Sequence, residues 1–474
     1  MTSKSLRTWA VVLTGLGSLM AALDTLVVST ALSEIRLDLG ASIEELEWTV
    51  NAYNLSFAVF LITAAALGDR FGRRRLYATG LALFAVASAA CALAPDVGWL
   101  IAARAAQGLG AAMVLTLGLA LLSAAFPPER RGAAIGLFSA ITGISVASGP
   151  LVGGAVVEGI AWEWIFWLNV PIGLAAVPLV LARIKESFGP DTGLDLPGLA
   201  LVTSAAFGTV WGLVRGNAAG WGSVEVVGAL AAGVLLAGAF VAWELRAREP
   251  MLPMSFFRSR AFSAGNTAIF FTFASLFTGV FFFAQLLQTV LAYGPLDAGL
   301  RLIPWTATFI TVAPVAGALA DRFGERPFMA GGLLLQAIGL AWIALLADAG
   351  VTYGELVIPL IVAGVGVSMA IPSGQNAAVS SVPEDAIGKA AGANSTAREL
   401  GGVFGIAITV AVFAGAGSYA SAQGFADGFA PAIGVAAAFS LAGSMAGLML
   451  PRGSGADRRR PVKPVPAVEA EGGT

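Results

Sequence analysis

The chain contains no histidine, a single cysteine and few charged residues. Only 12% of its 474 residues are charged, whereas a soluble domain carries about 25%. The lack of histidine excludes Ser-His and Cys-His catalysis, and Cys91 alone provides neither a disulfide nor a thiolate metal site. Proton chemistry must therefore use carboxylates, lysine, tyrosine or water. The net charge of −2 argues against a nucleic-acid partner.

Apolar sequence dominates instead. Hydrophobic residues make up 57% of the chain and the mean hydropathy is +0.82, so the solvent of this protein must be largely lipid. A helix needs roughly 20 apolar residues to cross a membrane, and fourteen such runs are present. The expected spans are 9–32, 48–68, 76–94, 98–125, 133–157, 164–183, 196–215, 224–245, 262–291, 297–319, 328–347, 354–373, 390–415 and 431–450. We predict an all-α integral membrane protein with a disordered tail over 451–474.

The basic residues predict the orientation of these spans. With the N-terminus in the cytoplasm, 23 of the 27 lysines and arginines fall on the cytoplasmic side. Those that fall elsewhere are Arg36, Arg104, Arg215 and Arg301. This agrees with the positive-inside rule at every cytoplasmic connection. We therefore expect both termini, including the tail, to be cytoplasmic.

Asp24 is a lone carboxylate in the apolar run AALDTLVVSTAL. A charge at this depth costs at least ~2.5–3.5 kcal/mol and usually faces the interior of a bundle. Desolvation favours the neutral form of a carboxyl, so Asp24 is a candidate for proton coupling or cation binding. The alternative is a structural carboxylate that caps a neighbouring helix.

Arg104 is the candidate partner of Asp24. Asp24 lies about eight residues, or ~12 Å, from the outer end of its span, and Arg104 about six residues, or ~9 Å, from the outer end of span 4. The two side chains should therefore be neighbours, with Arg104 stabilising the ionised carboxylate. The alternative is a fixed ion pair that joins the two spans without a role in coupling.

An internal repeat divides the chain. ALGDRFGRRR at 66–75 and ALADRFGERP at 318–327 follow spans 2 and 10, which are eight spans apart. Two six-helix halves with two extra helices between them explain this separation. The predicted units are a bundle at 1–185, two inserted helices at 186–250, a second bundle at 251–450 and the tail.

Five motifs, one of them present in two copies, resemble those of the major facilitator superfamily, and in particular its fourteen-helix drug:proton antiporters. They are the repeated loop above, LDTLVV at 23–28, RAAQGLG at 104–110, GPLVGG at 149–154 and WEWIFWLNVPIG at 162–173. The first loop departs from the signature at Ala65 and Gly68, and Ser145 replaces the middle glycine of the antiporter signature. The resemblance covers nearly the whole chain and implies the major facilitator fold.

The resemblance also implies roles for the motif residues. A cytoplasmic gate loop would include Asp69, Arg70, Gly72, Arg73, Asp321, Arg322 and Gly324. The alternative is a solvated loop whose basic residues only set the orientation of the spans in the membrane. It would not explain Asp69 or Gly72. A hinge or seal in span 5 would use Gly149, Pro150, Gly153 and Gly154, since small residues let helices approach and proline bends them. Tight packing without motion is the alternative. The span 4 motif would contribute Gln107 and Gly108 beside Arg104.

Span 9 carries an aromatic stripe with amide ends. Phe273, Phe277, Phe281, Gln285 and Gln288 recur at intervals of four and three and share one helix face. Such a face would bind flat amphipathic or cationic compounds, although a lipid-facing stripe is an equal alternative. Tyr53, Asn54 and Trp305 are further candidates for a substrate cavity.

We expect a proton-coupled antiporter that exports hydrophobic or cationic drugs from a bacterial cell, and lies in the cytoplasmic membrane. Its partners would be the bilayer, protons and a small amphipathic or cationic substrate. It would act as a monomer, without cofactor, ATP or nucleic acid, on the proton motive force. Alternatives are a dedicated exporter of one self-made metabolite, peptide or siderophore, and a proton-coupled importer. The sequence shows no catalytic cluster and no P-loop, which argues against an enzyme.

Overall fold

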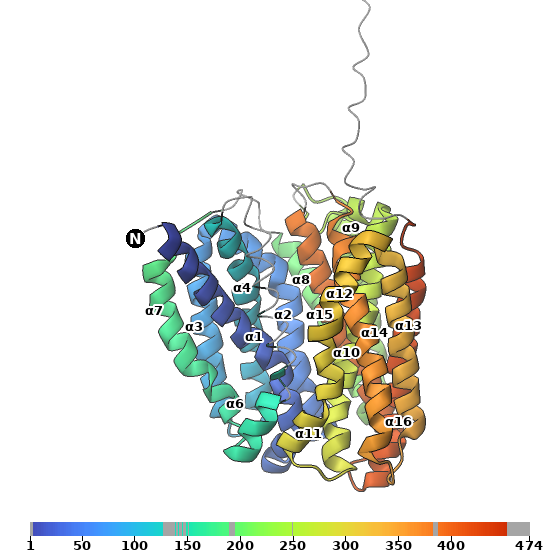
Figure 1. The fold of residues 1–474 in the computed structure, drawn as a ribbon. Coiled ribbons are helices and arrows are strands. Elements are labelled where there is room, and N and C mark those ends of the chain that lie inside the picture. The colour runs from blue at the N-terminus through green and yellow to red at the C-terminus, as the bar shows by residue number, and fades with distance from the viewer. Residues whose placement is uncertain are drawn as a thin grey trace, which may run out of the picture.

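The computed structural model describes residues 3–126, 138, 141, 145, 148, 149, 151–188, 195–248, 250–382 and 387–452, and is built from helices throughout these residues. The helices stand side by side, and α1 begins at the top of Figure 1 while α11 lies at the bottom. The first half contains α1 (Ser3–Leu39), α2 (Ile43–Phe71), α3 (Arg73–Ala92), α4 (Val97–Ala125), α6 (Trp164–Trp167) and α7 (Asn169–Arg183). Then follow α8 (Leu196–Ala219), α9 (Val224–Glu244), η1 (Met254–Arg258), α10 (Arg260–Thr289), α11 (Pro295–Arg301), α12 (Ile303–Phe323), α13 (Glu325–Leu346), α14 (Tyr353–Val379), α15 (Ile387–Ala416) and α16 (Ala422–Leu448).

Thirteen of the predicted spans have a counterpart among the described residues. Among the described residues eleven helices are long and apolar enough to cross a membrane, and the number rises to 13 if each of two bent helices is counted as one span. The bent helices are α1 and α2, whose axes turn by 44° and 52°. The remaining predicted span, 133–157, lies largely outside the described residues, although 151–159 are helical.

Several helix ends differ from the predicted ones because proline does not end a helix here. Span 14 was predicted to begin at Pro431, but α16 begins at Ala422 and contains this proline. Likewise α14 continues to Val379 past Pro359 and Pro372. Neighbouring helices can satisfy the backbone groups that a proline frees in a membrane bundle. The span predicted over 297–319 is interrupted at Leu302, between α11 and α12.

The helices pack in two groups that meet along a seam. In the first group α4 packs against α1, α2 and α3, and α7 against α3. In the second, α10 packs against α14, α15 and α16, and α13 against α14 and α16. At the seam α15 contacts α2, and α1 contacts α10. The predicted domain boundaries stay predictions.

The helix pair α8 and α9 lies beside this seam. α8 packs against α9 and also contacts α2 of the first group and α15 of the second. Only 17% of the apolar window of α9 is buried, compared with 83% for α10. α9 is therefore peripheral, and α10 is central.

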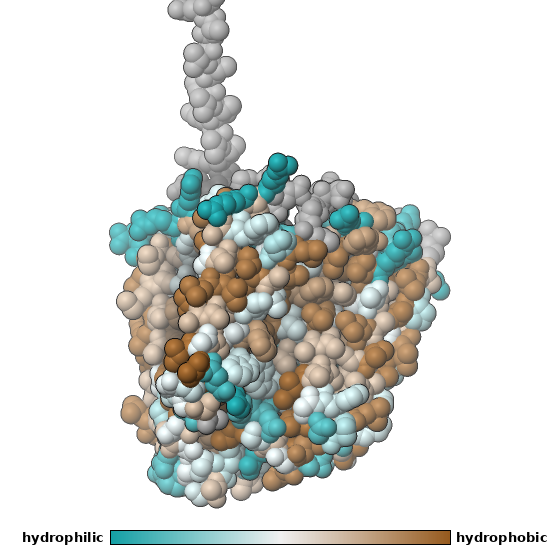
Figure 2. Space-filling view, turned by 180° about the vertical axis from the view of Figure 1, so that it is seen from behind, coloured by the Kyte–Doolittle hydropathy of each residue, from teal (hydrophilic) through white to brown (hydrophobic). Residues whose placement is uncertain are grey.

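The exposed surface agrees with a membrane setting. Figure 2 shows apolar side chains over the middle of one face, with hydrophilic ones at the top edge and in a group in its lower half. Large exposed apolar residues occur on many helices, among them Val86, Leu174, Leu235 and Leu345. Exposure of such side chains to lipid carries no hydrophobic penalty.

Candidate functional site

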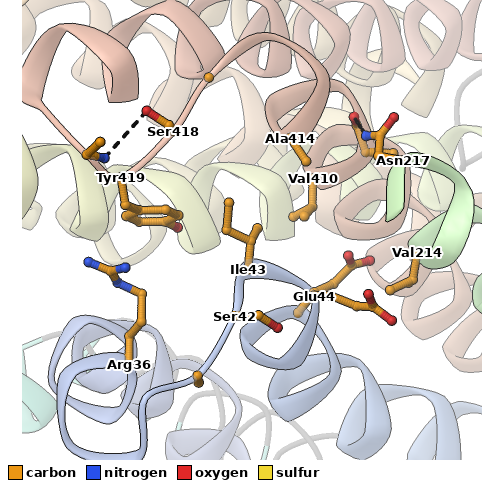
Figure 3. Close-up of a pocket in the computed structure, with 15 residues that line it drawn as sticks. Arg36, Ser42, Ile43, Glu44, Val214, Asn217, Val410, Ala414, Ser418 and Tyr419 are labelled. Atoms are coloured by element: carbon orange, nitrogen blue, oxygen red, sulfur yellow. Dashed lines mark hydrogen bonds between the residues drawn. The ribbon is translucent and has the colours of Figure 1, made fainter. Parts of the chain in front are cut away.

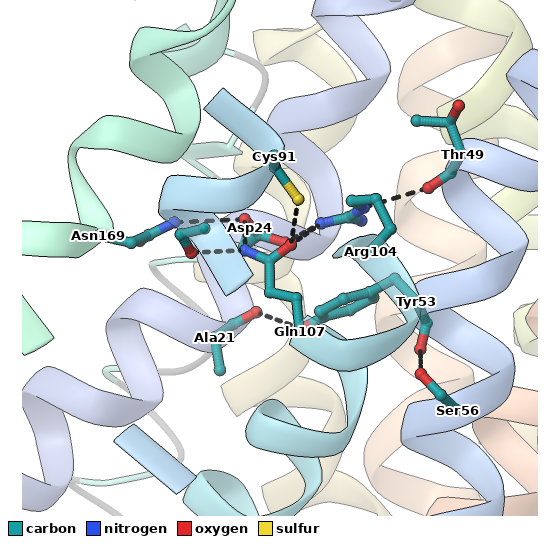
Figure 4. A network of polar contacts seen from close by, with 10 residues as sticks. Ala21, Asp24, Thr49, Tyr53, Ser56, Cys91, Arg104, Gln107 and Asn169 are labelled. Atoms are coloured by element: carbon teal, nitrogen blue, oxygen red, sulfur yellow. Dashed lines mark hydrogen bonds and ion pairs between the residues drawn. The ribbon is translucent and has the colours of Figure 1, made fainter. Parts of the chain in front are cut away.

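Asp24 lies at the centre of a buried polar network (Figure 4). Its Oδ2 accepts an ion-paired hydrogen bond from Nη1 of Arg104. Each residue is only 1% exposed. The axis of α1 bends between Arg7–Asp24 and Val27–Leu39, directly after the carboxylate. The predicted proximity of Asp24 and Arg104 is confirmed, and the depth argument was sufficient to find it.

Amide side chains surround the other oxygen of the Asp24 carboxylate. Oδ1 accepts hydrogen bonds from Nε2 of Gln107 at 2.9 Å and from Nδ2 of Asn169 at 3.3 Å. Gln107 also accepts from Nη1 of Arg104 at 2.7 Å and donates to Oγ of Ser88 at 2.8 Å. These donors offset part of the cost of burying the carboxylate.

The guanidinium of Arg104 is held on its other side by α2. Its Nε donates to the carbonyl oxygen of Thr49 at 3.1 Å, and its Cζ lies 4.2 Å from the centroid of the Tyr53 ring. This distance allows a cation–π interaction. The Tyr53 hydroxyl in turn donates to the carbonyl oxygen of Ala21 at 3.1 Å. Tyr53 was predicted for the substrate cavity, and here it supports Arg104.

Glycines bring the span 4 motif close to its neighbours. A Cβ on Gly108 would lie 2.3 Å from the carbonyl oxygen of Tyr53, and one on Gly110 would lie 2.8 Å from the backbone nitrogen of Phe84. No side chain fits at either distance, so α4 approaches α2 and α3 only with glycine at these positions. This close packing positions Arg104 and Gln107 against Asp24.

The two repeated loops share a backbone feature. Gly72 and Gly324 have φ values of 106° and 89°, and each N–H donates to a carbonyl four residues earlier. Glycine adopts such positive φ without strain. Arg70 and Arg322 lie over the rings of Phe71 and Phe323. The repeat seen in the sequence is therefore also a repeat of local structure.

Within the first loop, the acidic residue pairs locally. Oδ1 of Asp69 lies 2.7 Å from Nε of Arg73. The segment after α7 contacts the same loop, since Glu186 accepts from the Arg74 backbone at 2.8 Å and lies 2.9 Å from where a Gly72 Cβ would be. The described contacts of this loop thus lie within the first helix group. The Asp321 side chain is outside the described part of the chain.

The span 5 glycines lie at contacts with other helices. A Cβ on Gly153 would lie 2.7 Å from the carbonyl oxygen of Val27 in α1, and one on Gly154 only 2.3 Å from that of Pro295 in α11. The second contact crosses the seam. Gly149 is buried, and Pro150 lies outside the described residues.

Three predicted cavity residues meet at the seam. Asn54, Phe277 and Phe281 line a small cavity of about 10 Å³, which is room for about one water. Ser29, Val50, Val280 and Ile406 complete its lining. Phe273 packs edge-on against Phe277 at 5.8 Å. All three phenylalanines are buried, so the lipid-facing interpretation of the stripe is wrong.

The remaining cavity candidates lie apart from that cavity. Gln288 Nε2 donates across the seam to the carbonyl oxygen of Thr30 at 3.1 Å. Gln285 accepts a hydrogen bond from the Tyr419 hydroxyl. Trp305 packs against Phe283, with ring centroids 5.2 Å apart, inside the second group.

Asn169 and Glu47 are among the buried polar residues that sequence reasoning missed. Asn169 contacts Asp24 directly, and the only signal for it was a polar residue between apolar neighbours in WLNVPIG. Glu47 is only 1% exposed, but in sequence it follows two acids near a span end and resembles an interfacial residue. Glu399 pairs locally with Arg398 at 2.7 Å.

Many membrane-length helices in two packed groups, with a buried charged network in one of them, define a multi-pass membrane transporter. The sequence profile of the Major Facilitator Superfamily matches residues 14–406. The chain belongs to this superfamily, a class of transport proteins rather than enzymes.

Relatives and a solved structure agree with this assignment. The chain is 38% identical over 407 residues to the tetracenomycin C resistance and export protein of Streptomyces glaucescens, covering 85% of this chain and 75% of that protein. It is 35% identical over 403 residues to the multidrug resistance protein Stp of Mycobacterium tuberculosis, with the same coverage. A crystal structure of the peptide transporter POT in complex with sulfate has a TM-score of 0.68 at 16% identity, covering 96% of this chain and 100% of that one. The last match concerns the fold alone.

Proposed function

We propose that this protein is a proton-coupled antiporter that exports hydrophobic or cationic drugs across the bacterial cytoplasmic membrane. The observation that carries the proposal is the buried ion pair of Asp24 and Arg104. A carboxylate at membrane depth is costly to keep without a function. Relatives named for antibiotic resistance, export and multidrug resistance support the substrate class.

The ion pair provides a simple means of coupling. While Asp24 contacts Arg104, the carboxylate is ionised and stabilised by the adjacent cation. A movement of α4 relative to α1 that separates the two charges favours uptake of a proton from the outside. Re-pairing on the other side of the cycle releases that proton to the cytoplasm. The rival interpretation is a fixed pair that only joins α1 and α4. It predicts that replacing either residue leaves the coupling of dye transport to protons unchanged.

Alternating access would use contacts at both ends of the seam. The outer contacts are the Gly154 approach to Pro295, the Gln288 bond to Thr30 and the bond from the Leu296 backbone to Glu158 at 3.0 Å. We propose that span 5 opens and closes this outer contact. The loops of Asp69, Arg70, Gly72 and Arg73 and of Asp321, Arg322 and Gly324 would form the gate on the cytoplasmic side.

The proposed topology has fourteen spans with both termini in the cytoplasm. The thirteen helical spans and the predicted span at 133–157 support the number, and the distribution of lysine and arginine supports the orientation. In this arrangement the turn between α1 and α2 lies outside. The protein would act as a monomer and use the proton motive force without cofactor or ATP.

Transport of a cationic dye into proteoliposomes under an imposed pH gradient tests the proposed function. Wild-type protein should accumulate the dye against its concentration gradient only when the pH gradient is imposed, and Asp24→Asn should abolish this accumulation. Accumulation by the wild type without the pH gradient would exclude the antiport mechanism.

A narrower substrate range is the second candidate. The relative from Streptomyces glaucescens is named for a single antibiotic, which favours a dedicated exporter of one self-made compound. Dose-response curves in an efflux-deficient host distinguish the two. A broad pump raises resistance to several unrelated cations, and a dedicated exporter to one compound.

A further inference from the structure

A large cavity lies at the outer end of the seam, away from the Asp24 network. It has a volume of about 680 Å³, large enough for a drug-sized molecule. Its walls come from the end of α1 and the turn to α2, from α8, and from the end of α15 with the following loop. The inserted helix α8 thus contributes a wall that two six-helix bundles alone would lack.

The charges in this cavity are separated, as Figure 3 shows. At one end Arg36 stacks on Tyr419, with its Cζ 4.6 Å from the ring centroid. At the other end lies Glu44, and Ile43 stands between the two ends. Glu44 is 3.4 Å from Nη1 of Arg215 on α8. The aromatic face and this acid are therefore already occupied.

Among the described residues, Glu47 has no cationic partner. It lines the same cavity and is 1% exposed, and Nδ2 of Asn51 donates a hydrogen bond to its Oε1 at 3.2 Å. Among the described ion pairs of this corner, Arg215 bonds Glu44 and Glu225 rather than Glu47. A buried carboxylate without a cation is costly, so a positively charged ligand in this cavity would gain from pairing with Glu47.

The same face of α2 continues inward with unpartnered acceptors. Glu47, Asn51 and Asn54 are four and three residues apart, so they form a stripe along one helix face. Oδ1 of Asn51 and Oδ1 of Asn54 accept no hydrogen bond from any described residue, and both side chains are at most 1% exposed. Asn54 also lines the small seam cavity beside Phe277 and Phe281. The stripe therefore runs from the seam cavity to the outer cavity.

We propose that the outer cavity and the α2 stripe of Glu47, Asn51 and Asn54 bind organic cations that carry amine N–H groups. All three residues offer oxygen acceptors, which match a ligand with positive charge and N–H donors. Val214, Val410 and Ala414 provide the apolar wall for the body of such a compound. The proposal rests on the proposed function in one respect, since the stripe would carry the exported amine outward from the seam.

Two dyes separate the charge from the N–H donors. Rhodamine 6G is a cation with N–H groups, and tetramethylrhodamine ethyl ester is a similar cation without them. Binding to the purified full-length protein is measured by fluorescence anisotropy. We expect Glu47→Gln to weaken the binding of both dyes about tenfold, a typical effect of losing one charge-assisted contact. Asn54→Leu should weaken the binding of rhodamine 6G several-fold and leave the binding of the ester unchanged.

Glu34→Gln is the matched control, because Glu34 is an exposed acid near the same end of α1. If Glu47→Gln binds both dyes as tightly as Glu34→Gln does, the proposal is wrong. If Glu47→Gln binds normally but the wild type moves no dye under a pH gradient, the proposed function fails as well. If Glu47→Gln binds the dyes more weakly but the wild type moves no dye, the cavity is a binding site and only the proposed function is wrong.

A second measurement does not depend on folding of the Glu47 variant. Ala414 is exposed in the cavity, so Ala414→Cys should react with a cationic methanethiosulfonate. Saturating rhodamine 6G should slow this reaction at least several-fold, but not that of Leu37→Cys, which is 70% exposed and outside the lining. Equal labelling rates with and without dye would overturn the proposal.

Discussion

Removing either member of the Asp24–Arg104 pair should destabilise the protein, but with different pH dependence. In Arg104→Met the carboxylate keeps its bonds from Gln107 and Asn169 but loses its cation. In Asp24→Asn the Arg104 guanidinium keeps its contacts with Gln107, Thr49 and the Tyr53 ring. Breaking a buried ion pair by removing one partner costs about 3–5 kcal/mol. The double variant buries no charge, so its loss of unfolding free energy should be smaller than the sum of the losses in the two single variants, by a coupling energy of about 2 kcal/mol.

The pH dependence follows from which charge remains. The stranded carboxylate of Arg104→Met can take up a proton, which removes its charge. Its folded state then binds more protons than its unfolded state, so stability rises as the pH falls. The guanidinium of Asp24→Asn stays charged at any working pH. Its loss of stability relative to the wild type should therefore change little with pH.

The free energy of unfolding is measured in mixed micelles by titration with dodecyl sulfate, for the wild type, both single variants and the double variant, at two pH values. Cys91→Ala is a useful control, since it lies in the same network but carries no charge. A coupling near zero, or the same pH response in both single variants, would refute the reasoning.

Three further predictions concern other parts of the structure. Gly154→Ala places a Cβ 2.3 Å from the Pro295 carbonyl oxygen and should open the outer contact, so that Gln288→Cys reacts several-fold faster with an impermeant maleimide. Gly159→Ala, whose Cβ meets nothing within 4 Å, should leave the labelling rate unchanged. Equal labelling rates in the two variants would contradict the role of Gly154 in the outer contact. Gly72→Ala should cost about 3 kcal/mol of unfolding free energy, because it combines φ 106° with a contact to Glu186 at 2.9 Å. Gly40→Ala, with φ 63° in open space, should cost about 1 kcal/mol, and an equal cost at the two sites would show that the contact is unimportant. Asn169→Leu removes a donor to the ionised form of Asp24, so the pH of half-maximal dye transport should move upward; a downward shift would contradict the assigned geometry.

The general plan of the fold was predictable because its physical signals are local. Long apolar runs locate spans, and basic residues between them predict orientation. The ends of α14 and α16 were not predictable from the same signals, since a proline inside a membrane helix looks like a helix end in sequence. The interruption at Leu302 precedes Pro304, which lies in the first turn of α12, and the apolar run itself continues across it.

The site was predictable where depth decides the contact. Asp24 and Arg104 lie at similar depth in adjacent helices, and this was sufficient to pair them. Depth does not specify which face of a helix turns inward. Tyr53 therefore could not be assigned to Arg104 rather than to a cavity, and Glu47 could not be distinguished from its half-buried neighbour Glu45. Such assignments require the rotation of α2 about its axis.

The most direct test of the account is whether a substrate gradient alone moves protons. Proteoliposomes without a pH gradient or membrane potential are given an outward-directed gradient of a cationic dye, and the internal pH is followed with a trapped indicator. The account predicts that wild-type protein acidifies the lumen as dye leaves. Asp24→Asn should still exchange labelled for unlabelled dye, but without proton movement. Acidification by Asp24→Asn at the wild-type rate would contradict the assignment of Asp24 as the coupling carboxylate.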